Sequence, residues 1–483
     1  MEPKSKRQFY LRHLQSLEDG KPPRHSITPF SKIEKMSTSR YKPPRLIQAR
    51  HATHNIIMGS YIKPLEYSLF KNNKNKHHFG KGNFDQVAQK IQKFLSKYDH
   101  YTELDFDSFD AHVTPEHLKV THTYYNSCFK HDPELGHILK KTIKNVCVTR
   151  QGDKWKILGT RMSGDVDTSL GNSLIVYALL KQLLEELEME GDAIVNGDDS
   201  IIFTNKPIDI KKAVEILKKY NMTAKMKESV KNIHTVDFCQ SRFVYKSNGK
   251  PTMMMDPERV YSKFGMTHRV VTRDSYLHFL YELTECLGLT HCNTPIGYSW
   301  LDNLPAMTSL QRKEYKEFKY LDKEVFYAME QQRRCEVSDR TYTQSMFEAY
   351  PNVLEVAEKL RKLPRTISKF LMTPLNYTIH INHDSKTLAL NIIVTKIVDA
   401  TGQRIKKMRS KHKTNITDLT NPQITTLIRK FNDDIKIFEQ RRSRIQDSPQ
   451  HRTTKFISDS QSTSWADDDP DGLWLSDSYK QFV

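Results

Sequence analysis

Two adjacent carboxylates, Asp198 and Asp199, stand between two short apolar runs, residues 193–195 and 201–203. An Asn-Gly pair directly precedes them, which is one of the strongest signals for a tight β-hairpin. We therefore expect both acids at the tip of a hairpin. Ionised carboxylates that a fold holds side by side repel each other, and a divalent cation is the usual means of neutralising them. The pattern thus predicts a metal site at this turn.

A second acidic segment, LDFDSFDAHV at residues 104–113, precedes this pair. An apolar, aromatic-rich strand is expected to end at Asp105, and Asp110 follows where the chain can turn into a helix. Asp107 would face the same side of a regular strand as Asp105, which leaves open an Asp-x-Asp metal site of the glycosyltransferase type. That alternative predicts no Gly-Asp-Asp hairpin, so we interpret Asp107 as a peripheral acid.

A third segment lies between the other two and contains Ser163, Gly164, Thr168 and Asn172. These four residues at this spacing occur by chance in well under about one chain in a hundred of this length. Thr168 and Asn172 are one helical turn apart, so both can face one cleft. The apolar positions of the helix that follows are Leu174, Ile175, Ala178, Leu179, Leu183 and Leu187.

The three segments follow one another along the chain at residues 104–113, 163–172 and 193–203. In that order they resemble the palm of viral RNA-dependent RNA polymerases, and in detail those of the tombusvirus and carmovirus group of positive-strand RNA viruses. Residues 44–50 (PRLIQAR) are similar to the family's basic arm over the nucleotide channel, and residues 237–242 (DFCQSR) to its primer-grip turn. The resemblance implies an α+β right-hand polymerase with palm, partial fingers and a mostly helical thumb. It implies template-directed copying of a viral RNA genome by two-metal nucleotidyl transfer.

The resemblance also implies roles at the reacting phosphate. Asp105 and Asp198 would bridge Mg²⁺ or Mn²⁺ ions, with Asp199 in support. Lys225, or failing that Lys227, matches the position of a lysine that protonates departing pyrophosphate. A solvated lysine is the alternative, because both residues lie in a lysine-rich stretch.

On the sugar, the resemblance implies that Asp110 and Asn172 read the 2′ and 3′ hydroxyls of the incoming ribose. Ser163 and Thr168 would hold that network, and Gly164 would let the loop flex as nucleotide enters. A site built to hydrogen-bond a hydroxyl discriminates strongly against its absence. The alternative makes Asn172 an ordinary polar helix residue and Asp110 an N-cap.

Charge points to a polyanionic partner. The 483 residues carry 75 Lys and Arg against 57 Asp and Glu, a net charge of +18, which suits binding of RNA template, nascent RNA and nucleoside triphosphates. A generic basic surface would give the same balance. Arg45 and Arg50 of the arm are expected to hold triphosphate or template phosphates. Five residues apart on a strand they face opposite sides, so one of them can contact template instead.

We expect four regions. They are partial fingers with the basic arm (1–95), the palm (96–245) with a fingers insertion near 114–156, the helical thumb (246–366) and a C-terminal extension (367–483). The first forty or so residues are basic and rich in Pro and Ser, which predicts a mobile or partly ordered entry. In the extension we expect a β-hairpin from strands at 377–381 and 388–398 joined through 382–384, a basic run at 404–413 and a disordered acidic tail.

Six cysteines without a CxxC pair predict reduced thiols, and no apolar run is long enough to span a bilayer. We expect a protein of the host cytoplasm that another viral segment recruits to membrane-bound replication complexes. The resembling family has more fingers sequence before the arm than the 44 residues that precede Arg45 here. An upstream viral replication protein or extension is therefore an expected partner.

Two other functions fit part of the pattern. A reverse transcriptase-like polymerase usually has a residue other than Gly before the acid pair, and it does not need ribose-reading residues such as Asp110 and Asn172. A non-catalytic, basic RNA-binding replication factor would carry its acids incidentally. The presence of all three acids, Asp105, Asp198 and Asp199, argues against that interpretation.

Overall fold

The computed structural model describes residues 4–32, 44–72, 76–267, 272–304, 335–371, 379–384 and 389–394. Helices combine with mainly antiparallel sheets in an α+β fold, as predicted. The expected basic run at 404–413 and acidic tail lie outside the described residues. Within the described part, no helix has the length and apolar character needed to cross a membrane.

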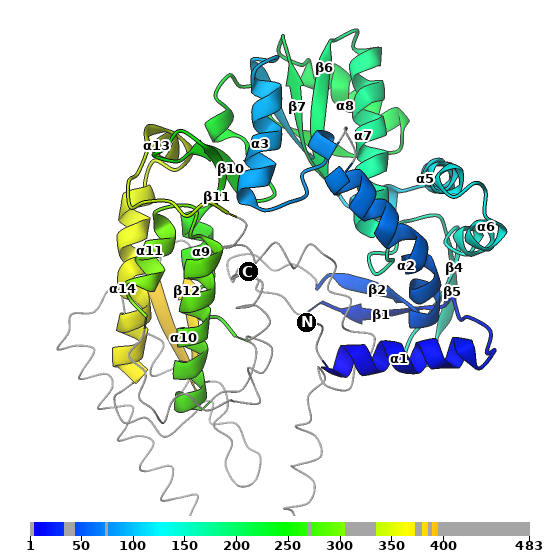
Figure 1. Cartoon of the computed structure of the whole chain (residues 1–483), viewed down its shortest axis with the longest axis horizontal. Coiled ribbons are helices and arrows are strands. Elements are labelled where there is room, and N and C mark those ends of the chain that lie inside the picture. The colour runs from blue at the N-terminus through cyan, green and yellow to red at the C-terminus, as the bar shows by residue number, and fades with distance from the viewer. Residues whose placement is uncertain are drawn as a thin grey trace, which may run out of the picture.

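A four-stranded antiparallel sheet lies at the centre of the chain. Its strands are β6 (Gly191–Asn196), β7 (Asp199–Thr204), β3 (His100–Phe106) and β8 (Ala224–Met226), in the order β6-β7-β3-β8. Helices α7 (Thr168–Glu186) and α8 (Ile210–Lys219) lie on one side and α3 (Phe84–Leu95) on the other (Figure 1). Successive side chains of a strand point to opposite faces, so this sheet is buried on both sides.

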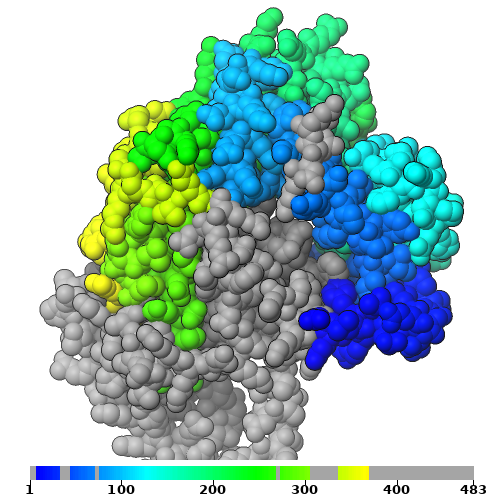
Figure 2. All heavy atoms as spheres, viewed as in Figure 1, coloured from blue at the N-terminus to red at the C-terminus, as the bar shows by residue number. Residues whose placement is uncertain are grey.

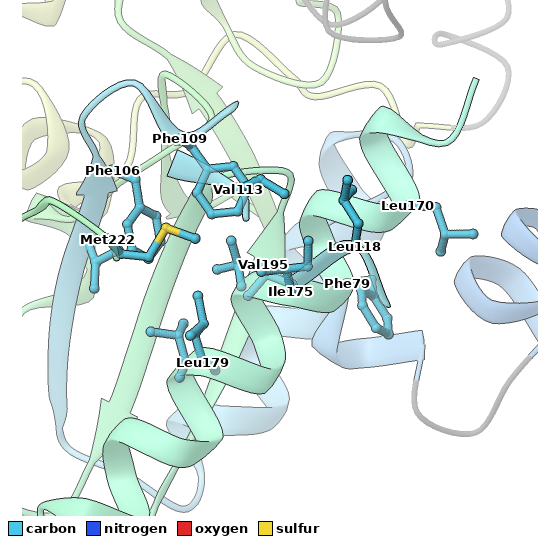
Figure 3. Packing of buried hydrophobic residues seen from close by; sticks show 14 of the residues in the cluster. Phe79, Phe106, Phe109, Val113, Leu118, Leu170, Ile175, Leu179, Val195 and Met222 are labelled. Atoms are coloured by element: carbon cyan, nitrogen blue, oxygen red, sulfur yellow. The ribbon is translucent and has the colours of Figure 1, made fainter. Parts of the chain in front are cut away.

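The core between α7 and the sheet fixes the end of β3. Figure 3 shows Phe106, Phe109, Val113 and Met222 gathered where β3 ends, in the same cluster as apolar side chains of α7. Phe109 is 3% exposed, and full burial of such a side chain contributes roughly 1.5–3 kcal/mol. The acidic segment that leaves β3 is therefore anchored from both of its ends.

A second sheet joins the N-terminal region to the segment that follows β3. Its order is β2-β1-β4-β5, with β1 (Ile27–Ser31) antiparallel to β2 (Leu46–Arg50) and parallel to β4 (Lys144–Val148), which pairs with β5 (Lys154–Leu158). The helices around it are α1 (Lys4–Glu18), α2 (Ala52–Tyr67), α5 (Pro115–Cys128) and α6 (Pro133–Lys140) (Figure 1).

We expected a mobile or partly ordered N-terminus, and within it residues 4–18 form the helix α1. Phe9 is 4% exposed, and its ring centre lies 4.3 Å from that of His13. His13 in turn meets His51 at 5.2 Å. Tertiary packing of one aromatic face thus stabilises a helix that the basic, polar composition does not suggest.

The described part of residues 237–371 is mainly helical. It holds α9 (Pro257–Lys263), α10 (Arg273–Thr290), α11 (Ile296–Leu301), α13 (Gln344–Ala349) and α14 (Val353–Leu371), next to a sheet of β9 (Asp237–Phe238), β10 (Ser241–Tyr245) and β11 (Pro251–Met255). Figure 2 shows these helices on the opposite side of the molecule from α1. The shorter helices are α4 (Phe109–His112), η1 (Ser68–Asn72), η2 (Lys76–His78) and η3 (Ile233–Thr235).

In the C-terminal extension, β12 (Ile379–Asp384) pairs antiparallel with β13 (Ala389–Val394). Residues 382–384, which we expected in the turn, lie within β12, and the connection at 385–388 lies outside the described residues. Asn and Asp are common turn residues, but they do not exclude a strand when the apolar alternation continues on both sides.

Candidate active site

The turn between β6 and β7 carries the acid pair, which confirms the predicted hairpin. Asn196 pairs with Asp199 across the two strands, and Gly197 has a φ of +68°, which favours glycine at this turn position. The Gly197 amide donates to Ser173 Oγ of α7 at 2.9 Å, and Asn196 Nδ2 contacts Cys239 Sγ at 3.1 Å. The tip of the hairpin is therefore held from both faces of the sheet.

Asp105 lies beside this tip. Leu104 pairs with Ser200 of β7, so Asp105, one residue further along, lies next to Asp199 on the antiparallel neighbour. On its other side Asp105 pairs with Lys225 of β8. The sheet register thus brings together three of the four residues that the sequence predicts at the reacting phosphate, and Asp198 follows in the turn.

The three carboxylates influence one another. Partial burial raises the pKa of Asp199 to about 7, and repulsion from Asp198 and then Asp105 adds to the shift. Burial also raises the pKa of Asp198, to which Asp105 contributes while Arg45 acts in the opposite direction. Such repulsion is what a bound cation relieves.

A metal would need ligands from outside the protein as well. No group of three or more His, Cys, Asp or Glu side chains in the described ranges is arranged to hold a metal ion. Mg²⁺ usually keeps several waters and binds through one or two carboxylates together with substrate phosphates. Asp105, Asp198 and Asp199 fit that incomplete ligand set, because they are acidic, adjacent and mutually repelling.

The two candidate lysines have different neighbours. Lys225 Nζ lies 2.8 Å from Asp107 Oδ2, and both side chains are exposed, at 66% and 49%. The hydrogen bond to Asp107 raises the pKa of Lys225, which keeps the ammonium protonated. Lys227 instead pairs with Glu103 at 2.8 Å and with Asp237 at 3.3 Å. Lys225 is thus the one that adjoins Asp105, and Asp107 serves as its ion-pair partner.

Asp110 and Asn172 form a direct pair at the start of α7. Asn172 Nδ2 donates to Asp110 Oδ1 at 2.9 Å. Burial raises the pKa of Asp110 to about 6, although the hydrogen bond from Asn172 opposes the shift. Asp110 and Asn172 are 62 positions apart in the chain and face one another. Asp110 follows the C-terminal end of β3, and Asn172 lies near the N-terminal end of α7.

This pKa shift predicts a pH-dependent effect of Asp110→Asn on stability. Between about pH 4 and pH 6 the folded protein holds more protons than the unfolded chain, whose carboxyl titrates near 3.8, so this group's contribution to stability falls as pH rises. Asn is always neutral and keeps an oxygen for Asn172. We expect the variant to be more stable by up to about 3 kcal/mol above pH 6 and unchanged near pH 3.5. Thermal melting at both pH values measures this, and a gain that is equal at both would contradict it.

Ser163 and Thr168 hold their own loop. Ser163 Oγ accepts from the Gln48 amide at 3.1 Å, while Thr168 Oγ1 donates to the carbonyls of Met162 and Asp165 at 3.0 and 2.8 Å. We expected these hydroxyls to help hold the network around Asp110 and Asn172. Their hydrogen bonds shape the loop that precedes α7, and their contribution to that network stays a prediction.

Gly164 is required for a different reason from the one expected. Its amide donates to the Gln48 carbonyl at 3.1 Å. A Cβ at this position would lie 2.5 Å from that carbonyl oxygen and 2.7 Å from Ala49 Cα. The loop is packed against the backbone of β2, so close approach by itself requires a glycine here, and the expected flexing of the loop stays a prediction.

Arg50 does not present its guanidinium to solvent, which corrects the expectation that it holds phosphates. The residue is 1% exposed, and its Nη2 donates to Asp165 Oδ2 at 2.9 Å and to Asn145 Oδ1 at 2.7 Å. Arg50 lies at the C-terminal end of β2, where both Ala49 and Arg50 are buried. Arg45 is exposed and lies close enough to Asp198 to lower the pKa of that carboxyl.

The two arginines are therefore expected to respond differently to alanine substitution. Arg50→Ala leaves Asp165 buried without its cation and should cost about 3–5 kcal/mol of stability. Arg45→Ala should leave the melting temperature within a degree or two of wild type and raise the KM for nucleoside triphosphate by about tenfold. Melting scans and steady-state kinetics test both. A stable Arg50→Ala protein, or an Arg45→Ala protein with unchanged KM, would contradict the assignment.

Sequence reasoning missed the buried partners of the site. Arg161, Asp165 and Asp167 lie in the loop before α7 at 2%, 8% and 2% exposure. Cys239, expected in the turn that resembles the primer grip but not at the acidic site, shares a hydrogen bond with Asp199. Charged residues in a short loop carry no periodicity, so nothing in the pattern marks them as buried. The one available indication of a buried charged cluster was the presence of three charged residues among the seven residues 161–167, which include Ser163 and Gly164.

Comparison with known proteins agrees with this geometry. Residues 4–349 match the family described as "Viral RNA dependent RNA polymerase". The RNA-directed RNA polymerase of Panicum mosaic virus (strain United States/Kansas 109S) is 30% identical over 230 residues, which cover 45% of this chain and 23% of that protein. That of Tobacco necrosis virus (strain A) is 28% identical over 306 residues, covering 59% and 41%. That of Groundnut rosette virus (strain MC1) is 33% identical over 247 residues, covering 47% and 29%. The chain spans less than half the length of these relatives.

Proposed function

The chain belongs to the viral RNA-dependent RNA polymerase family, and from this premise we propose that it joins nucleoside triphosphates into RNA on an RNA template. The observation that carries the proposal is the meeting of Asp105 with the Asp198–Asp199 hairpin, next to the Asp110–Asn172 pair. One group of side chains suits a cation at a phosphate, and the other suits the hydroxyls of a ribose.

The family implies a divalent metal cofactor, and we propose Mg²⁺ or Mn²⁺. Asp105, Asp198 and Asp199 would hold it, because hard cations prefer carboxylate oxygens. When bound, such ions stabilise both the attacking and the leaving oxygens of an in-line displacement at phosphorus. The raised pKa of Asp199 near 7 supports this proposal, since the apo site gains most from a cation at and above neutral pH.

The other side chains would bind and orient the nucleotide. At the ribose hydroxyls, Asp110 accepts a hydrogen bond and Asn172 donates one. Arg45 contacts phosphates close to Asp198. Lys225 delivers a proton to the departing pyrophosphate. The pairing of Lys225 with Asp107 supports a lysine that stays protonated until the more basic leaving oxygen of pyrophosphate replaces Asp107 as its partner.

We further propose the right-hand division of this family for the chain. Residues 96–245 would be the palm, with the fingers insertion near 114–156, and residues 246–366 the helical thumb. In support, β1 and β2 share one sheet with β4 and β5, which joins residues 1–95 to the insertion. Residues 367–483 would be an extension. Because α14 runs to Leu371 and buries Ile367, the test removes only residues 372–483: unchanged nucleotide incorporation would agree with that division, and a loss of folding would contradict it.

For the setting of this activity, we propose replication complexes on membranes of the host cytoplasm, reached through an upstream viral replication protein or extension. The premise is membership in a family of viral polymerases. Fluorescence microscopy of the tagged chain, expressed alone and with the in-frame upstream viral segment, tests this. Recruitment that does not depend on the upstream segment would contradict it.

Primer extension by the purified chain on an RNA template tests the function itself. We expect incorporation of NTPs that requires a divalent cation and exceeds incorporation of dNTPs by about a hundredfold or more. Equal use of dNTPs would support the reverse transcriptase-like alternative. RNA binding without incorporation of either, even after the upstream segment is added, would support the non-catalytic alternative.

A further inference from the structure

Arg161 lies behind the Asp110–Asn172 pair and contacts neither bulk solvent nor the expected substrate position. It is 2% exposed, in the loop between β5 and α7. Its Nε donates to Asn172 Oδ1 at 3.0 Å, and its Nη1 donates to Asp167 Oδ2 at 2.7 Å. The backbone amide of Arg161 donates to the Asp110 carbonyl at 2.8 Å. The residue therefore touches both members of the pair.

This contact determines which way the Asn172 amide points. A guanidinium has only donors, so the atom of Asn172 that faces Arg161 must be its oxygen. The Asn172 amino group then faces Asp110, to which it donates at 2.9 Å. An amino group has two N–H bonds and a carboxylate two oxygens, so this orientation offers a hydroxyl both a donor and an acceptor. With the amide reversed, the oxygen of Asn172 would face the carboxylate and the donor would be lost.

Arg161 is itself held in one position. Asp167 Oδ2 accepts from Arg161 and also from Tyr125 OH at 3.3 Å. Gly171 leaves the space that the guanidinium occupies, because a Cβ there would overlap Arg161 Nη2 and lie 3.1 Å from Tyr125 OH. Tyr125 and Asp167 are 0% and 2% exposed. A planar, fully buried fork with fixed partners is well suited to orient a neighbouring amide.

We propose that Arg161 is a positioning residue which, acting through Asn172, sets the preference of this site for ribonucleotides over deoxyribonucleotides. The inference rests on the proposed polymerase function. It differs from a purely structural role for the Arg161–Asp167 ion pair, which would affect folding but would treat the two kinds of nucleotide alike.

A double-mutant cycle separates these roles. Arg161→Lys keeps a cation for Asp167, but a single ammonium cannot reproduce the fork that also reaches Asn172. We expect it to lower the ratio of kcat/KM for ATP over dATP by about tenfold. In an Asn172→Ala background the same substitution should change the ratio less than about twofold, because its route to the sugar is gone. Arg340→Lys, at an exposed arginine that pairs with Asp302, is the matched control and should leave the ratio unchanged.

The results distinguish the inference from the function on which it rests. A wild-type chain that incorporates no nucleotide, even after the upstream segment is added, overturns both. A wild-type chain that extends primers, with an unchanged ratio in Arg161→Lys or an equal fall in both backgrounds, overturns the inference alone. If Arg161→Lys does not fold, Tyr125→Phe removes the hydrogen bond to Asp167 while keeping the ring. We expect Tyr125→Phe to lower the ratio of kcat/KM for ATP over dATP by about threefold, and only when Asn172 is present. An unchanged ratio in a folded Tyr125→Phe protein would overturn the inference.

Discussion

Asp198→Asn is expected to reduce nucleotide incorporation by at least about a thousandfold while RNA binding stays within about twofold of wild type. The substitution keeps the shape of the side chain in the β6–β7 turn and removes the charge that would hold a cation. RNA affinity depends on phosphate contacts with basic side chains elsewhere, so it should not change. Single-turnover primer extension and filter binding measure the two quantities.

Asp192→Asn is the matched control. Asp192 lies on β6, at the far end of the same hairpin, and its carboxylate is 3.2 Å from His78. The same chemical change there should leave incorporation within about threefold of wild type, because no reacting group is near. A folded Asp198→Asn protein that extends primers at a tenth of the wild-type rate or more would exclude the metal-holding role.

Gly164→Ala is expected to lower incorporation by about a hundredfold, a loss typical of small displacements in an active site. The added Cβ would meet the Gln48 carbonyl oxygen and Ala49 Cα, both backbone atoms that no rotamer change can move. The loop must then separate from β2, which displaces Ser163 and the start of α7. The effect should appear in the rate per folded molecule.

Gly59→Ala provides the comparison, since Gly59 of α2 faces the same loop. Its added Cβ would have only Val166 Cγ2 nearby, at 3.7 Å, which is ordinary van der Waals contact. We expect full activity and a gain of about 0.5–1 kcal/mol in stability, as for Gly to Ala within a helix. Wild-type rates in Gly164→Ala, or an equal loss in both variants, would show that close packing at Gly164 is unimportant.

Local pattern was enough to predict the acidic hairpin, with its turn and the two apolar strands that flank the turn. Tight turns and strands have short-range signals, so the Asn-Gly pair and its apolar flanks fixed the position of Asp198. Thr168 and Asn172 were expected on one helix because their spacing is one turn. That Asp105 lies beside Asp199 follows from the register of two strands in which Leu104 pairs with Ser200, 96 positions further along the chain, and here only the resemblance to a family supplied the pairing.

Burial of charged residues could not be predicted in the same way. Arg50 was expected at the surface because arginine usually is, whereas its partner Asp165 lies 115 positions away. Arg161 was not noticed at all, since its role depends on the orientation of a single amide. Helix α1 was missed because packing of Phe9, which composition does not reveal, stabilises it.

The parallel pairing of β1 with β4 also bears on synthesis of the chain. Residues 27–50 acquire their sheet neighbour β4 and the buried partner of Arg50 only after about 115 further residues have been made. At about 5–20 residues per second, this takes about 6–23 s. During that time β1 can pair with β2 but not with β4, and contacts of such high sequence separation form slowly. The emerging N-terminal segment is therefore one part of this protein that a chaperone on the ribosome would shield.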